Sequence, residues 1–129
     1  MNIILDTCTF LYATLESEKL SRLAIELLED PNNCLFLSSI SVYEIIVKYK
    51  LGKLELKIDP VKSIPEYRNK LGILELAIKE QEILLIAKLP DIHNDPFDRI
   101  IITQAIANDF VILTPDKFIH DYQLIKVIW

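Results

Sequence analysis

Residues 3–6 read Ile-Ile-Leu-Asp, a short apolar run that ends at an acid close to the start of the chain. Consecutive apolar residues are typical of a strand that is buried on both faces of a parallel sheet. Asp6 is then expected at the carboxyl end of this first strand. Open parallel sheets bind their ligands outside that end of the strands.

Other apolar runs alternate with helical patterns along the rest of the chain. The predicted strands are 3–5, 34–37, 73–78, 110–113 and 124–128, and the predicted helices are 20–28, 42–50, 60–72, 79–88 and 96–108. Asp59-Pro60 and Asp95-Pro96 are typical helix starts, because an N-cap acid precedes proline at the first helical position. Strands that alternate with helices predict an α/β, Rossmann-like domain of three layers, in which helices cover both faces of a short parallel sheet of four to five strands.

Length and composition bound the class of protein. The 129 residues are 51% hydrophobic and 26% charged, which predicts one folded domain over 1–129 and excludes global disorder. The longest apolar runs are far shorter than the roughly 18 to 20 residues of a membrane span. No secretory signal precedes Asp6, so a cytoplasmic location is expected. Cys8 and Cys34 are interpreted as free thiols, since no zinc spacing or disulfide framework is present.

The charge is unevenly distributed. The net charge is −5, which disfavours coating of nucleic acid through bulk charge. Residues 45–70, however, hold seven bases and three acids, and the remainder holds seven bases and sixteen acids. Lys48, Lys50 and Lys53 in the basic segment either follow a nucleic-acid strand or form a solvated helix face.

Four acids are expected at the carboxyl edge of the sheet: Asp6, Glu44, Asp98 and Asp116. Four carboxylates at one edge repel one another unless a cation neutralises them, and hard oxygen ligands suit Mg²⁺, with Mn²⁺ as the alternative. The pattern therefore predicts a divalent metal site.

Each acid also has a purely structural interpretation. Asp6 is placed to cap the following helix, and Ser41-x-x-Glu44 matches a capping box. Asp98 in a first helical turn favours the helix dipole, and Asp116 in a Thr-Pro-Asp turn is ordinary turn chemistry. Only the coincidence of all four acids at one edge favours the metal site.

Four segments carry a family resemblance: LDTCTFLY at 5–12, SSISVYEIIVKYKLGKL at 38–54, IHNDPFDRIIITQA at 92–105 and ILTPDKFIHDY at 112–122. In order and spacing they resemble the PIN-domain nucleases, and in particular VapC-type toxins of toxin-antitoxin pairs in the subgroup with a DPFDR motif. The likeness covers essentially the whole chain. It implies a single PIN domain over 1–129 and metal-dependent cleavage of RNA phosphodiester bonds, and the acidic positions of the family fall on the same four acids.

Neighbours of these acids have expected supporting roles. Thr7 and Thr114 are candidates for orienting a carboxylate or a bound water, or for ordinary turn hydroxyls. Arg99 and Lys117 are candidate phosphate contacts. Members of the subgroup often carry two histidines before DPFDR, and only the second, His93, is present here, so its role is left open between loop packing and catalysis.

The expected partners are an RNA substrate, a small antitoxin encoded by an adjacent gene, and a second copy of the chain in a homodimer. A housekeeping RNA-processing nuclease and a non-catalytic PIN-like interaction module are the alternatives. A phosphoacceptor receiver domain is excluded, because Asp6 is a single acid and strand 73–78 runs into Ala77-Ile78-Lys79 without an acceptor aspartate.

Overall fold

The computed structural model describes residues 1–129 and contains five strands, seven α-helices and two 3₁₀ helices. The strands are β1 (Asn2–Leu5), β2 (Cys34–Ser38), β3 (Ile73–Leu76), β4 (Val111–Leu113) and β5 (Val127–Ile128). The helices are α1 (Thr7–Leu15), η1 (Ser17–Lys19), α2 (Arg22–Glu29), α3 (Ser39–Lys50), α4 (Pro60–Leu71), α5 (Glu80–Leu84), η2 (Leu85–Lys88), α6 (Pro96–Asn108) and α7 (Lys117–His120). None of these helices has the length and apolar character needed to cross a membrane.

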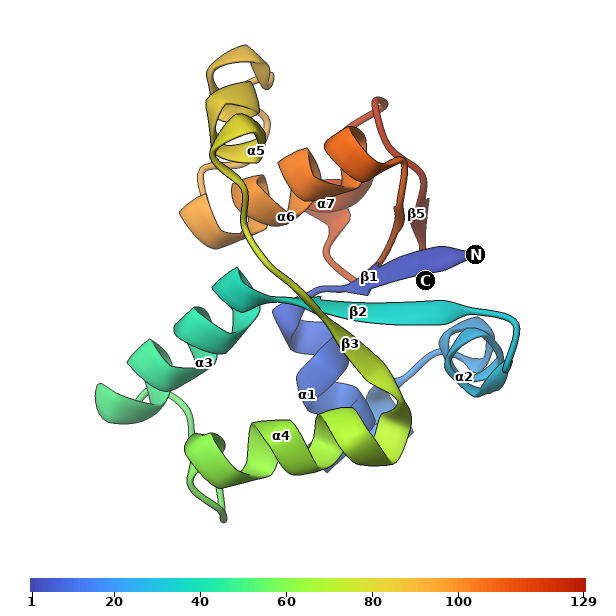
Figure 1. Cartoon of the computed structure of the whole chain (residues 1–129), viewed down its shortest axis with the longest axis vertical. Helices are drawn as coiled ribbons and strands as arrows, with labels where there is room; N and C mark the ends of the chain where they lie inside the picture. The colour runs from blue at the N-terminus through green and yellow to red at the C-terminus, as the bar shows by residue number, and fades with distance from the viewer.

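The sheet is entirely parallel and has the order β3-β2-β1-β4-β5. Figure 1 shows α1 to α4 on one side of it and α5 to α7 on the other. The side chains of β1 alternate between two cores: Ile3 and Leu5 pack with Phe10 and Ile45, and Ile4 packs with Ile101. The predicted three-layer α/β architecture is therefore confirmed.

Two helix starts and one helix end follow the sequence closely. Asp59 caps α4 through the N–H of Val61, and Asp95 caps α6 through the N–H groups of Phe97 and Asp98. Gly72 ends α4 with a φ of 65°, a left-handed conformation that glycine adopts without strain.

The alternative interpretation of Ser41 and Glu44 as a capping box is wrong. Helix α3 begins at Ser39, and its N-cap is Ser38, whose hydroxyl accepts the N–H of Ile40. The helix therefore starts directly after β2, and Glu44 lies in its second turn with its carboxylate free of any capping role.

The largest other differences from the prediction concern three elements. Strand β3 ends at Leu76, β5 is only Val127–Ile128, and the helix predicted over 79–88 is divided into α5 and η2. These segments lie at the edges of the sheet or on its outer layer, where fewer neighbours extend a regular element.

Candidate functional site

A cavity of about 460 Å³ opens at the carboxyl edge of the sheet. Strand β1 lies between β2 and β4 in the sheet. From β1 the strand order runs through β2 to β3 on one side and through β4 to β5 on the other, so the order reverses at this position. All four acids predicted for the metal site line the cavity. Its charged lining residues are Asp6, Glu44, Lys48, Lys53, Asp95, Asp98 and Asp116.

Asp6 follows β1 directly and is only 3% exposed. Its Oδ2 accepts the hydroxyl of Thr114 at 2.5 Å, and its Oδ1 accepts the N–H of Thr9 at 2.7 Å. The carboxylate thus caps α1 and also belongs to the cavity. Burial raises the pKa of Asp6, and the hydrogen bonds from Thr114 and Thr9 oppose that rise.

Glu44 reaches the same cavity from α3. Its Oε1 accepts the hydroxyl of Thr7 at 2.6 Å, and its Oε2 pairs with the Lys48 ammonium, one turn further along the helix, at 2.5 Å. The hydrogen bond to Glu44 raises the pKa of Lys48. Each carboxylate oxygen of Glu44 is therefore held by a donor of the chain itself.

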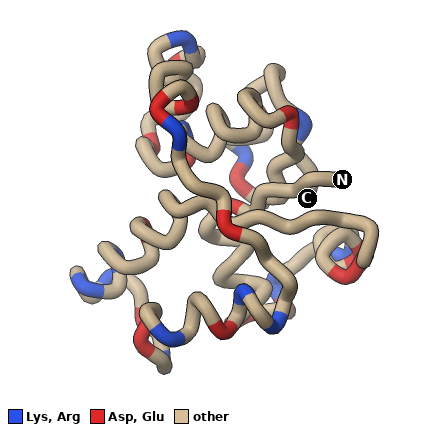
Figure 2. The backbone as a smooth tube through the Cα atoms, in the orientation of Figure 1, with Lys and Arg blue, Asp and Glu red and all other residues tan.

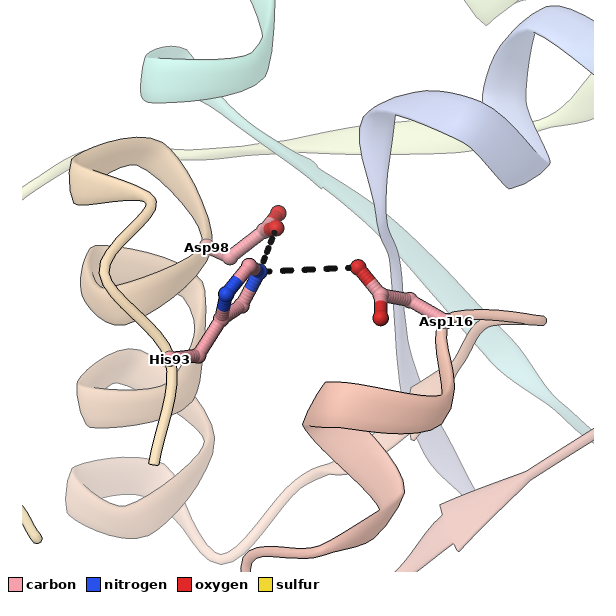
Figure 3. A group of neighbouring side chains, drawn as sticks. All are labelled: His93, Asp98 and Asp116. Atoms are coloured by element: carbon pink, nitrogen blue, oxygen red, sulfur yellow. Dashed lines mark hydrogen bonds and ion pairs between the residues drawn. The ribbon is translucent and has the colours of Figure 1, made fainter. Parts of the chain in front are cut away.

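Asp98 lies in the first turn of α6 and contacts His93 in the loop before that helix. The His93 Nε2 is 2.8 Å from Oδ2 of Asp98 and 3.5 Å from Oδ2 of Asp116 (Figure 3). Burial, followed by repulsion from Asp95, raises the pKa of Asp98 from 3.8 to about 7, although the bond from His93 acts in the opposite direction. A cation that enters the cavity favours the ionised form of this carboxyl and lowers its pKa.

Asp116 follows β4 at the turn into α7. Its Oδ1 accepts the N–H of Phe118, and its own N–H donates to the Thr114 hydroxyl. Thr114 therefore connects Asp6 to Asp116 through one buried side chain.

Arg99 and Lys117 do not line the cavity. The Arg99 guanidinium donates to the carbonyl oxygens of His93 and Ile86, which makes it a support of the loop around His93. Lys117 is exposed in the first turn of α7. Their role as phosphate contacts stays a prediction.

The donor set fits a divalent cation. Five carboxylates and two ammonium groups line one cavity. Among the carboxylates that pair with neither ammonium group, Asp6 and Asp98 are the most buried, and both have a raised pKa. A group of carboxylates that outnumbers the cations of its cavity is the environment in which oxygen ligands bind Mg²⁺ or Mn²⁺. One atom each from His93, Asp98 and Asp116 lie within 4.8 Å of one another.

Two residues of the site gain importance from the structure. Lys48 was left between a strand-binding face and a solvated helix face, and it contacts Glu44 inside the cavity. The i, i+4 spacing from Glu44 is the signal that indicates this pair. His93 was left between packing and catalysis, and its five-residue spacing from Asp98 across Asp95-Pro96 carries no general signal for a contact.

Comparisons with known proteins agree with this fold. Residues 3–123 match the PIN domain. A search of curated proteins found no matching relative.

Among solved structures, a chain in the crystal structure of VapBC2 from Rickettsia felis bound to a DNA fragment from their promoter superposes with a TM-score of 0.75 at 18% identity, covering 99% of this chain and 98% of that one. A chain of VapBC-1 from nontypeable Haemophilus influenzae gives a TM-score of 0.67 at 21% identity, covering 99% and 97%. A chain of DNA-bound VapBC from Salmonella typhimurium gives 0.66 at 17% identity, again covering 99% and 97%. At these identities the likeness shows a shared fold. Because the family match extends from β1 to beyond α7, this chain belongs to the PIN domain family.

Proposed function

We propose that the chain is a metal-dependent endoribonuclease that hydrolyses RNA phosphodiester bonds, and that it is the toxin of a toxin–antitoxin pair. The observation that carries the proposal is the convergence of Asp6, Glu44, Asp98 and Asp116, which come from four separate segments, on one cavity of a PIN domain. The VapBC structures that share the fold support the toxin assignment.

The carboxylates are the proposed ligands of Mg²⁺, with Mn²⁺ as the alternative. When bound, such an ion polarises a phosphoryl oxygen and lowers the pKa of a bound water, so no protein nucleophile is needed. Thr7 and Thr114 fix the orientation of Glu44 and Asp6 through short hydrogen bonds. Ligands held in this way lose little freedom when they bind, which favours a defined geometry at the reacting phosphate.

The cations of the cavity are the proposed phosphate-binding groups. Lys48 and Lys53 line it beside the acids, and Figure 2 shows further Lys and Arg along the segment from the end of α3 through α4. Ammonium groups at this position orient a nucleic-acid strand through its phosphates without reading its bases.

The decisive test is incubation of the purified chain with a pool of cellular RNA, with and without Mg²⁺, followed by end mapping. Asp6→Asn and Asp98→Asn are expected to abolish cleavage, Asp116→Asn to reduce it less, and Asp121→Asn, which changes an exposed acid outside the cavity, to leave it unchanged. Cleavage that persists in EDTA, or near wild-type activity in Asp6→Asn, contradicts the proposal.

The toxin assignment has a separate test in cells. Expression of the wild-type chain without a partner is expected to arrest bacterial growth, and expression of Asp6→Asn is not, because toxicity depends on the carboxylate site. Normal growth with a demonstrably active enzyme favours the housekeeping nuclease instead.

The proposed partner is a small antitoxin from an adjacent gene, whose basic tail enters the cavity. A guanidinium forms bidentate bonds with carboxylates, and five of them line this cavity. Substitution of the C-terminal basic residues of that protein is expected to weaken both binding and inhibition. The homodimer stays a prediction, for which sedimentation of the purified chain is the measurement.

A further inference from the structure

The imidazole of His93 occupies a position between two carboxylates that come from different segments. Its Nε2 is 2.8 Å from Asp98 Oδ2 and 3.5 Å from Asp116 Oδ2, and Figure 3 shows all three side chains pointing toward one another. Asp98 begins α6, Asp116 follows β4, and His93 belongs to the loop between η2 and α6. The loop before α6 brings His93 to Asp98, and tertiary structure brings Asp116 to both.

The separations match those of neighbouring ligands on one metal ion. Adjacent donors around an octahedral ion with bonds of about 2.1 Å lie about 3 Å apart, and opposite donors lie about 4.2 Å apart. The two distances from His93 Nε2 lie on either side of 3 Å, and the whole group lies within 4.8 Å. The two distances from His93 Nε2 are therefore compatible with a shared coordination sphere.

Two hydrogen bonds hold the backbone of His93, and one aromatic contact holds its ring. The N–H of His93 donates to the Tyr122 hydroxyl at 3.1 Å, its carbonyl oxygen accepts from Arg99 at 3.1 Å, and its ring stacks on Phe118 with centroids 5.2 Å apart. The backbone contacts fix the position of His93 in the loop, and the stacking on Phe118 orients its ring toward the two carboxylates, so the imidazole is pre-organised as a ligand. His120, the other histidine of the chain, directs its Nε2 to the carbonyl oxygen of Thr114 instead.

We infer that His93 is a nitrogen ligand of the metal in this site, together with Asp98 and Asp116, and that the site therefore prefers Mn²⁺ to Mg²⁺. The inference rests on the proposed metal-dependent function and specifies its cofactor. Mg²⁺ strongly prefers oxygen ligands, whereas affinity for imidazole nitrogen increases along the first-row transition ions. Ligation uses the neutral imidazole, with its proton on Nδ1 and its lone pair on Nε2.

Pulsed electron paramagnetic resonance of the Mn²⁺-loaded full chain tests this directly, because a coordinated imidazole modulates the electron spin echo through its ¹⁴N nucleus. The wild type and His120→Gln are expected to show this modulation, and His93→Gln is expected to lose it. Labelling of the wild type with ¹⁵N-histidine is expected to replace the ¹⁴N modulation by ¹⁵N modulation. This measurement does not depend on the folding of any variant.

Competition between the two ions gives a second measurement. His93→Gln is expected to lower Mn²⁺ affinity about tenfold or more while changing Mg²⁺ affinity little, so that the preference between them falls. His120→Gln is the matched control and is expected to keep the wild-type preference.

The inference is overturned if Mn²⁺ binds without nitrogen modulation, if the modulation persists in His93→Gln, or if Mn²⁺ does not bind. If one of these results is found and RNA cleavage still depends on Asp6 and Asp98, the proposed function is unaffected. Nitrogen-coupled Mn²⁺ in a chain that cleaves no RNA supports the inference and counts against the proposed function alone.

Discussion

Substitution of Asp98 by asparagine is expected to stabilise the metal-free protein at neutral and alkaline pH. Burial and the nearby Asp95 raise the pKa of Asp98 from 3.8 to about 7. The folded state thus binds this proton more tightly than the unfolded chain, so the free energy of unfolding falls as pH rises from about 4 to about 7 and stays low above that. Asparagine has the same shape and no charge, and it removes this loss.

The size of the effect follows from the shift. About three pKa units at 1.36 kcal/mol each set a ceiling of about 4 kcal/mol, and screening at an effective dielectric constant of about 20 reduces the expected gain to about 2 kcal/mol. For a domain of this length the gain corresponds to a rise of about 8 °C in Tm. The gain is expected to shrink toward zero as pH falls to about 4.

Thermal unfolding in EDTA, measured between pH 4 and pH 8, checks the prediction. Asp91→Asn is the matched control, because that carboxylate is 95% exposed and lies 3.8 Å from Arg99 at the surface, where an ion pair contributes at most about 1 kcal/mol. Addition of Mn²⁺ or Mg²⁺ is expected to raise the Tm of the wild type more than that of Asp98→Asn. Parallel pH profiles for wild type and Asp98→Asn, or a less stable variant at pH 8, refute the reasoning.

Three further substitutions test the supports of the site and of the fold. Thr114→Val removes the hydroxyl that binds Asp6 and is expected to lower RNA cleavage about 10- to 100-fold in a kinetic assay, since misoriented ligands weaken a metal site. Lys48→Met frees one oxygen of Glu44, for which the ammonium and a divalent cation compete. Calorimetric titration is expected to show affinity for divalent cations that is about threefold to tenfold higher, in line with a contribution of about 1 kcal/mol from the ion pair. Unchanged affinity contradicts this competition. Glu82→Ala removes a buried carboxylate that accepts three hydrogen bonds where α5 meets α6, and is expected to cost about 3 kcal/mol in denaturant unfolding without altering cleavage by the folded fraction.

The layered fold was predictable because each strand is a short apolar run and each long helix has its own start or end signal. Helix α1 had no predicted bounds, although it contributes Phe10 to the core. Its sequence, TCTFLYATL, places apolar residues around most of the helix and therefore lacks the one-sided periodicity of a surface helix. Its start is fixed by Asp6, which follows β1 and both caps α1 and lines the cavity.

The acids of the site and the threonines that orient Asp6 and Glu44 were predictable from their positions after strands and at helix starts, whereas the local role of Glu44 and the contact of His93 were not. Glu44 illustrates the limit. Its spacing from Ser41 favours a capping box, but the preceding strand ends at Ser38 and α3 begins at once, which moves the cap by one turn. The contact between His93 and Asp98 depends on the path of a loop fixed by Tyr122, a residue 29 positions away.

Strand β1 precedes the other four strands in the chain, yet it occupies the centre of the sheet. It pairs with β2 on one side and with β4 on the other, in the register Ile3 to Val111, and the bond from Thr114 to Asp6 joins residues 108 positions apart. On the ribosome, β1 therefore waits as an apolar edge strand, a form prone to pair with other chains, until β4 emerges. The carboxylate cluster forms only when the last third of the chain has arrived, so a polypeptide that stalls before Thr114 lacks an assembled carboxylate site.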